Sequence, residues 1–252
     1  MANAIHPSAV IGKGTKLGDG NTIGPGCILE DGVVLGSNNR LWMHVYVGPG
    51  TTIGDRNTIR EYVTIHRGTK EGTSTIVGDD NFLMANAHLG HNCQVGHHTI
   101  LTNLATLAGY CAVEDGAVLS GMVVVHQFVR IGRLAMVSGL SAVNKDVPPY
   151  LLCAGRPALI HGLNAVGLRR AGLAPAVREE IKRAYKRLYR EGLNVRHALE
   201  VIAQECRSPE VQAMVEFVKQ AKRGISAGIG AEVSKEEAES LLPRKPPQRN
   251  FS

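Results

Sequence analysis

An aliphatic residue recurs at every sixth position through more than half of this 252-residue chain. From Ile5 to Val143 the spacing defines 24 positions, and 23 of them hold Leu, Ile or Val. A six-residue period fits neither an α-helix nor a simple alternating strand, and it is typical of a parallel β-helix. Three hexapeptides make one triangular coil of 18 residues, with the aliphatic side chains inside. Coils stack at strand spacing, roughly 4.8 Å, so residues 18 apart lie one above another.

The exception to the period, Glu71, lies in the polar segment 66–75. Asn21, Asn39 and Asn57 are spaced by 18 residues, whereas Asn81 follows Asn57 by 24. A six-residue loop near Glu71 would account for the difference and would restore one column of Asn side chains. We therefore predict a prism that runs from about residue 4 to residue 148, with seven to eight coils and one loop that leaves it.

The period stops at residues 147–150, and helical spacing of apolar residues follows from about residue 162. The fold predicted from these patterns is all-β, a left-handed parallel β-helix of hexapeptide repeats over residues 1–150. A small α-helical domain is predicted over 151–225. The polar stretch 226–252, which ends in KPPQRNFS, is expected to be a flexible tail.

Charge and composition narrow the class of protein. The net charge of +6 and the pI of about 9.2 suit an acidic partner or a phosphorylated ligand. The sequence lacks the basic stripe interleaved with aromatic residues that would indicate nucleic-acid binding. It also lacks the long apolar run that would indicate a membrane span. The five Cys lack CxxC spacing and are interpreted as reduced thiols. With no signal-peptide pattern at the N-terminus, we expect a cytoplasmic protein.

Histidines gather where the repeat places corner residues. With the loop allowed for, His66 and His126 share one column with two small residues, Gly90 and Ala108. The next column holds His91, Gly109 and Gln127, and the one beside it Asn92, Tyr110 and Phe128. Polar groups from distant parts of the chain should therefore meet in one groove with room for a ligand. His97 and His98 are interpreted as solvated turn residues.

Several segments resemble the UDP-N-acetylglucosamine acyltransferase family. They include the NAHxxHxC and VHQF elements and lie at residues 59–69, 80–96, 106–110, 120–132, 144–150 and 162–173. The resemblance implies transfer of a (3-hydroxy)acyl chain from acyl carrier protein to the 3-hydroxyl of UDP-N-acetylglucosamine, the first step of lipid A biosynthesis. It also implies a homotrimer with sites between subunits and no cofactor or metal, since phosphopantetheine arrives on the donor substrate.

The same resemblance implies roles for particular residues. His91 matches the general base, and the Gly109 amide matches the donor to the thioester oxygen. Gly139 and Pro157 match positions that select the acyl chain. The expected substrate-binding residues are His66, His88, Tyr110, His126, Gln127, Asn164, Arg169 and Arg170.

Departures from the family pattern leave alternatives open. Asn92 stands where many members have Asp, Tyr110 stands where His is usual, and a sugar-contacting loop before residues 54–57 is missing. The missing loop leaves open a 3-amino sugar or another nucleotide sugar as acceptor. The two substitutions leave open a non-catalytic scaffold trimer. A zinc enzyme on the same prism is disfavoured because Ile131 stands where a second His would follow His126.

Overall fold

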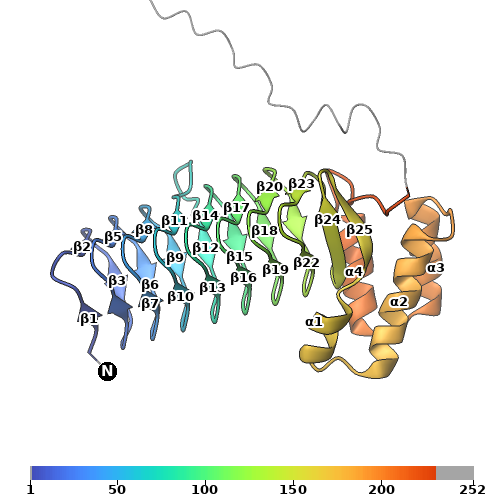
Figure 1. Cartoon of the computed structure of the whole chain (residues 1–252), viewed down its shortest axis with the longest axis horizontal. Helices are drawn as coiled ribbons and strands as arrows, with labels where there is room; N and C mark the ends of the chain where they lie inside the picture. The colour runs from blue at the N-terminus through green and yellow to red at the C-terminus, as the bar shows by residue number, and fades with distance from the viewer. Residues whose placement is uncertain (1, 231–252) are drawn as a thin grey trace, which may run out of the picture.

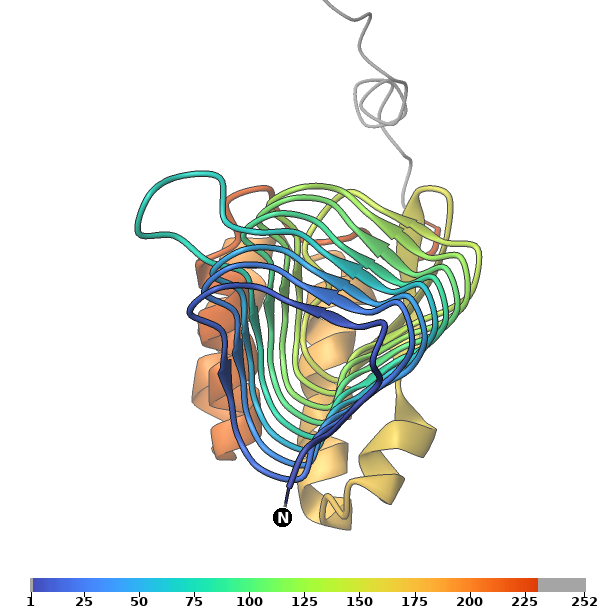
Figure 2. The same cartoon turned by 90° about the vertical axis from the view of Figure 1, so that its left-hand side faces the viewer.

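The computed structural model describes residues 2–230, which form a long triangular prism with helices at one end (Figure 1). Each flat side of the prism is a parallel sheet built from two-residue strands, one strand per coil. This is the left-handed parallel β-helix that the six-residue period predicts. Seen end on, the coils superimpose as a triangle (Figure 2).

The three sheets are named A, B and C in the order in which the chain visits them. Sheet A contains β1 (Ala4–Ile5), β4 (Thr22–Ile23), β7 (Arg40–Leu41), β10 (Thr58–Ile59), β13 (Phe82–Leu83), β16 (Ile100–Leu101), β19 (Val118–Leu119) and β22 (Met136–Val137). Sheet B contains β2 (Val10–Ile11), β5 (Ile28–Leu29), β8 (Tyr46–Val47), β11 (Thr64–Ile65), β14 (His88–Leu89), β17 (Thr106–Leu107), β20 (Val124–Val125) and β23 (Ala142–Val143). Sheet C contains β3 (Lys16–Leu17), β6 (Val34–Leu35), β9 (Thr52–Ile53), β12 (Ile76–Val77), β15 (Gln94–Val95), β18 (Ala112–Val113) and β21 (Arg130–Ile131).

The strand register confirms the predicted loop. Most paired residues are 18 apart, as Ala4 and Thr22 are. Across the polar segment the spacing becomes 24, and Thr52 pairs with Ile76. The extra residues leave the prism between β11 and β12 at the corner that joins sheets B and C (Figure 2). We call the three edges the A–B, B–C and C–A corners.

The prism interior is filled by the periodic aliphatic residues and by a ladder of Asn. From Ile23 onward, the aliphatic of every strand in β4–β23 is buried. Asn21, Asn39 and Asn57 each accept the backbone N–H of the Asn in the next coil, as where Asn39 Oδ1 accepts from Asn57 N at 2.8 Å, and Asn81 ends the ladder by accepting from Thr99 N. The ladder satisfies backbone donors that turns inside a stacked coil would otherwise leave unpaired.

One residue in nearly every hexapeptide turns the chain with a positive φ near 60°. Gly and Asn take this left-handed conformation at little cost, and Gly32 and Asn38 are examples. Farther along, Asn92 takes the same position at φ 62°, and the larger Tyr110 takes it in the next coil at φ 60°. The turn therefore aims these two side chains outward from the B–C corner in successive coils.

Residues 151–163 differ from the prediction, which assigned them to the helical domain. They form β24 (Leu151–Gly155), which extends sheet A parallel to β22, and β25 (Ala158–Leu163), which returns antiparallel to it. Leu151 and Cys153 alternate with less buried neighbours, so the segment buries one face as a strand does. The pair covers the open end of the prism.

The helical domain consists of α1 (Ala165–Arg170), α2 (Pro175–Tyr189), α3 (Val195–Glu205) and α4 (Pro209–Lys219). Asn164 and Asn194 cap α1 and α3 through side-chain bonds to backbone N–H groups. Helices α2, α3 and α4 pack on one another, and α2 contacts β25. No helix within residues 2–230 is long and apolar enough to cross a membrane.

The first residues of the predicted tail are also ordered against the prism. Ser226 is buried and its N–H donates to Asp146 O, while Ala227 O accepts from Ile160 N. These backbone bonds hold residues 226–229 beside the last strands, which the polar composition of the segment did not predict. The remaining part of the predicted tail, 231–252, lies outside the described residues.

Candidate active site

His91 lies on the B–C corner directly above Gly109 of the next coil. A Cβ atom built on Gly109 would lie 2.3 Å from Cε1 and 2.4 Å from Nε2 of His91. The imidazole therefore packs on the bare backbone at Gly109. The N–H of Gly109 donates to no atom of residues 2–230. At the C–A corner, the equivalent backbone N–H donates to a side chain of the next coil, as where Asp55 N donates to Asp79 Oδ1.

Asn92 and the loop of residues 66–75 surround the inner nitrogen of His91. His91 Nδ1 lies 3.1 Å from Asn92 Oδ1. The same oxygen accepts from the N–H of Thr69 at 3.1 Å and from its hydroxyl at 3.0 Å. Thr75 closes the base of the loop, because its hydroxyl accepts from Asn92 N and donates to His66 O. Asn92 is therefore nearly buried and held from two sides.

Tyr110 borders the imidazole of His91 on the side of the next coil. The two rings meet edge to face with centroids 5.2 Å apart. Tyr110 also stacks on Phe128 at 4.9 Å, and its hydroxyl lies 3.2 Å from Thr69 Oγ1. Asn92, Tyr110 and Phe128 thus form the column that the repeat predicts. Thr69 was not predicted, because a loop that leaves the prism follows no repeat.

His66 and His88 form a pair on the sheet B side of the same corner. Their rings meet edge to face with centroids 4.8 Å apart, and His88 Nδ1 bonds to Thr64 Oγ1 at 2.8 Å. Burial lowers the pKa of His88 below its ordinary value, and the neighbouring His66 lowers it further. His88 therefore favours the neutral form, in which one ring nitrogen donates a hydrogen bond and the other accepts one.

His126 and Gln127 occupy the B–C corner three coils beyond His66 and two coils beyond His91. The N–H at Nδ1 of His126 donates to the carbonyl oxygen of Gln127 at 3.0 Å, which leaves Nε2 as an acceptor. The structure thus brings together seven of the predicted site residues along one corner: His66, His88, His91, Gly109, Tyr110, His126 and Gln127.

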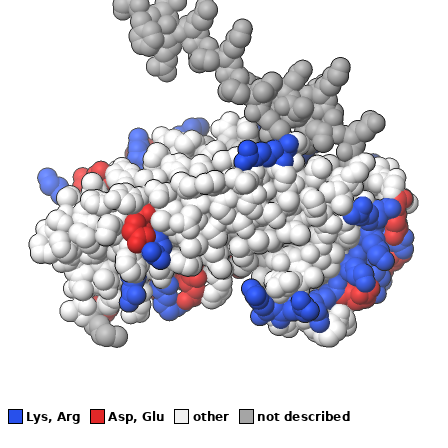
Figure 3. All heavy atoms as spheres, viewed as in Figure 1, with Lys and Arg blue, Asp and Glu red and all other residues white. Residues whose placement is uncertain are grey.

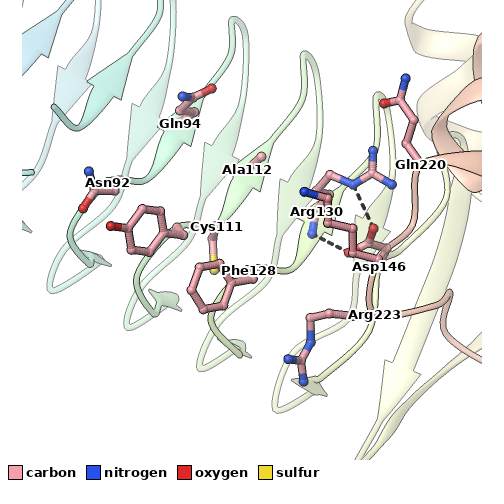
Figure 4. Close-up of a pocket in the computed structure, with 11 residues that line it drawn as sticks. Asn92, Gln94, Cys111, Ala112, Phe128, Arg130, Asp146, Gln220 and Arg223 are labelled. Carbon is pink, nitrogen blue, oxygen red and sulfur yellow. Dashed lines mark hydrogen bonds and ion pairs between the residues drawn. The ribbon is translucent and has the colours of Figure 1, made fainter. Parts of the chain in front are cut away.

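A groove of about 760 Å³ begins beside Asn92 and follows sheet C toward the helical domain. Figure 4 shows Asn92 and Phe128 along it, with Arg130 and Arg223 at the far end, and Tyr110 also lines the groove. Arg130 forms a 2.8 Å ion pair with Asp146 and lies over the ring of Phe217. Arg223 donates from Nε to Asn144 O. Aromatic rings and cations thus line opposite ends of the groove.

The other predicted residues lie away from His91 within one chain. Gly139 is on the A–B corner, where its Cβ position faces Gly121 O. Pro157 lies in the turn between β24 and β25, and its neighbour Arg156 donates to Leu140 O on that same corner. Asn164 caps α1, and Arg169 and Arg170 stand in the last turn of this helix.

Histidines and cysteines outside the corner have structural surroundings. His97 accepts from Asp79 N on the C–A corner, as part of the side-chain ladder there. All five Cys are buried and free. Among residues 2–230, no three His, Cys, Asp or Glu side chains converge in the way that metal ligands do.

Comparisons with known proteins match both parts of the chain. A family model described as UDP N-acetylglucosamine O-acyltransferase, domain 2, matches residues 146–226. A bacterial transferase hexapeptide model matches residues 32–67 and 74–109. Acyl-[acyl-carrier-protein]–UDP-N-acetylglucosamine O-acyltransferases of Halorhodospira halophila and Thiobacillus denitrificans are 43% and 44% identical over 86 residues. These alignments cover 34% of this chain and 33% of each relative, so they span about a third of the relatives' length.

Solved structures match over nearly the whole chain. The UDP-N-acetylglucosamine acyltransferase of Francisella novicida is 33% identical with a TM-score of 0.81, covering 95% of this chain and all of that one. The acyltransferase of Campylobacter jejuni is 34% identical with a TM-score of 0.75, covering 88% of this chain and 99% of that one. At this identity and coverage, the chain belongs to the UDP-N-acetylglucosamine acyltransferase family.

Proposed function

We propose that the chain transfers an acyl group, expected to be 3-hydroxyacyl, from acyl carrier protein to the 3-hydroxyl of UDP-N-acetylglucosamine, the first step of lipid A biosynthesis. The observation that carries the proposal is the stacking of His91 on Gly109, because it sets a base beside a free backbone donor. Family membership supports the same reaction. A donor carried on acyl carrier protein would place the reaction in the cytoplasm.

In the proposed reaction His91 acts as general base. Its Nε2 takes the proton of the sugar 3-hydroxyl as the oxygen attacks the thioester carbonyl carbon. Negative charge develops on the thioester oxygen, and the Gly109 N–H donates to it. The intermediate then expels the phosphopantetheine thiolate, which recovers the proton from His91, so that the free thiol leaves. A positioned base contributes roughly 10²- to 10⁴-fold to such a step.

The remaining groove residues would hold the two substrates. His66, His88, His126 and Gln127 present ring nitrogens and an amide along the B–C corner, where sugar hydroxyls and the thioester arm would lie. Acyl transfer involves no change of oxidation state, and hydrogen-bond donors can stabilise the charge that develops on the thioester oxygen. We therefore propose no cofactor other than the phosphopantetheine of the acyl carrier protein.

The second candidate acceptor is a 3-amino nucleotide sugar, favoured by one observation. Sheet register stays at 18 residues from β6 to β9 and from β7 to β10, so no loop interrupts the coil before residues 54–57. A loop with sugar contacts is expected there from the family, and its absence relaxes the constraint on the sugar. Mass spectrometry of products from a mixed acyl carrier protein pool, offered UDP-N-acetylglucosamine and its 3-amino analogue in parallel, tests both candidates and reads the chain length.

We propose a homotrimer with sites between subunits, and the positions of the predicted acyl-selection residues support it. Gly139 and Pro157 lie at the A–B corner and His91 at the B–C corner, so one chain does not bring them together. The A–B corner also exposes a column of large apolar side chains, with Leu104 at 44%, Met122 at 51% and Leu140 at 54% exposure. We propose that a second copy covers this corner and adds its residues to the B–C corner.

The trimer proposal predicts an assembly defect from a single charge. Met122→Glu should dissociate the trimer in analytical ultracentrifugation and should lower acyl transfer with it. Val34→Glu is the matched control, because Val34 is an exposed apolar residue on sheet C, away from the A–B corner. A Met122→Glu protein that remains trimeric would contradict the assignment of this corner to the subunit contact.

The acyl carrier protein would dock on the basic helices α1 and α2. Residues 165–191 hold eight basic and three acidic side chains, and Figure 3 shows Lys and Arg gathered over this end of the molecule. Glu191 and Glu205 pair with Arg187, whereas Arg169, Arg170 and Lys186 form no ion pair within residues 2–230. Unpaired cations of this kind attract an acidic carrier and raise its association rate.

A further inference from the structure

The carbonyl oxygen of Asn92 receives three hydrogen bonds, and one of them fixes the orientation of the amide. Thr69 N lies 3.1 Å from Oδ1, and a backbone N–H can only donate. The atom that faces it must therefore be the carbonyl oxygen and not the amide NH2 group. The backbone N–H of Thr69 therefore determines which way the Asn92 amide is turned, since the oxygen and nitrogen of an amide are assigned from their hydrogen-bond partners.

The orientation of Asn92 then decides which nitrogen of His91 carries the proton. His91 Nδ1 lies 3.1 Å from the same Oδ1. Because that oxygen only accepts, Nδ1 must be the donor, so the neutral ring carries its hydrogen on Nδ1. The outward Nε2, which packs over Gly109, keeps its lone pair. This is the tautomer that a general base acting through Nε2 requires.

The donors continue outward through the loop to Tyr110. The hydroxyl of Thr69 lies 3.0 Å from Asn92 Oδ1 and must donate its one hydrogen to it. The Tyr110 hydroxyl, 3.2 Å from Thr69 Oγ1, can then only donate to that oxygen. The bonds thus run from Tyr110 to Thr69 and from Thr69 to Asn92, with His91 donating to Asn92 from the other side.

We infer that Thr69 is a positioning residue, which sets the tautomer of His91 through Asn92, and that the hydroxyl of Tyr110 supports it. The inference rests on the proposed function. Asn92 carries no charge, so this chain orients the base with a neutral amide oxygen. A carboxylate at this position would attract the imidazole N–H by its charge and would not need a loop to hold it. The loop between β11 and β12 supplies the donors that hold the amide in place.

Thr69→Val tests the inference, because it removes the hydroxyl and keeps the shape of the side chain. Thr69 lies on the exposed loop, so its replacement opens no core cavity. We expect kcat to fall about 3- to 10-fold, the effect of one neutral hydrogen bond, with KM unchanged for both substrates. Nitrogen-15 NMR of the imidazole in the substrate-free protein should show a smaller share of the Nδ1–H tautomer. Tyr110→Phe should move both readouts in the same direction and by less.

Thr73→Val is the matched control in the same loop. Thr73 Oγ1 bonds only within the turn at Lys70 and does not contact Asn92. It should leave kcat and the tautomer as in the wild type. Equal losses in the two variants would show that loop order matters and the hydroxyl of Thr69 does not, which overturns the inference.

The NMR measurement also separates this inference from the proposed function. A wild-type imidazole protonated on Nε2 would overturn the tautomer assignment even if the enzyme is active. A protein with the Nδ1–H tautomer that transfers no acyl group would overturn the proposed function and not the assignment. A Thr69→Val protein that changes KM alone would make Thr69 a substrate contact and would contradict its positioning role.

Discussion

The imidazole of His91 occupies the space that a Cβ atom on Gly109 would need, with Cε1 only 2.3 Å from that position. Gly109→Ala must therefore push the ring away from the backbone below it. Because a displacement of about 1 Å at a catalytic group can cost 10²-fold, we expect acyl transfer to fall about 100-fold or more. Turnover and melting temperature should be measured together, and the melting temperature should change little.

Gly162→Ala is the control for this substitution. Gly162 lies in β25, away from the B–C corner, and an added Cβ would meet no atom within 4 Å apart from its chain neighbours. This variant should keep wild-type turnover. If Gly109→Ala retains activity comparable to Gly162→Ala, the ring of His91 does not depend on the backbone beneath it.

Neighbouring valines with opposite orientations test the register of the prism. Val33 is fully buried and Val34, the next residue, is 37% exposed on sheet C. Val33→Ala should lower the free energy of unfolding by about 2–3 kcal/mol, through lost burial and a cavity. Val34→Ala should cost less than about 1 kcal/mol. A denaturant titration in which both cost the same would show that the six-residue register is misplaced.

Most of the prism could be predicted because its side-chain period is set by geometry. Each coil must bury one aliphatic per side, so the period and the Asn spacing determined both the register and the loop between Asn57 and Asn81. Residues 151–163 were not predicted as strands because β25 returns antiparallel to β24, and a hairpin of this kind does not follow the six-residue period. The position of Ser226 was not predicted either, because its bond to Asp146 O is a backbone contact that no side-chain pattern encodes.

The candidate site was predictable to the same extent as the register. Because residues 18 apart stack, the repeat alone predicts that His91, Gly109 and Gln127 share one corner. Thr69 could not be placed in this way, because the loop path depends on tertiary contacts with Asn92 and Tyr110. The groove beyond Phe128 was missed because Arg223 reaches it from the segment after α4.

The lowered pKa of His88 makes folding stability depend on pH. The unfolded chain protonates this ring near its ordinary pKa of about 6.5, whereas the folded protein resists protonation because the ring is partly buried. Below about pH 6.5 the unfolded state binds more protons than the folded state does. The stability that is present above this pH is therefore lost as the pH falls through the lower pKa of the folded protein. His88→Gln should lose less unfolding free energy between about pH 7.5 and 5.5 than wild type. Parallel slopes for the two proteins in denaturant titrations would contradict the effect of burial on His88.

The most direct measurement of the central claim is acyl transfer by His91→Ala beside the wild type, with acyl carrier protein loaded with 3-hydroxyacyl chains and UDP-N-acetylglucosamine. His91 stands on an outward corner, so its removal creates no cavity in the prism. The wild type should form the 3-O-acyl product, and His91→Ala should lose roughly 10²- to 10⁴-fold of that rate while circular dichroism and trimer mass stay the same. A folded His91→Ala protein that keeps most of the activity would contradict the role of His91 as base. A wild type that forms no product would instead favour a non-catalytic scaffold.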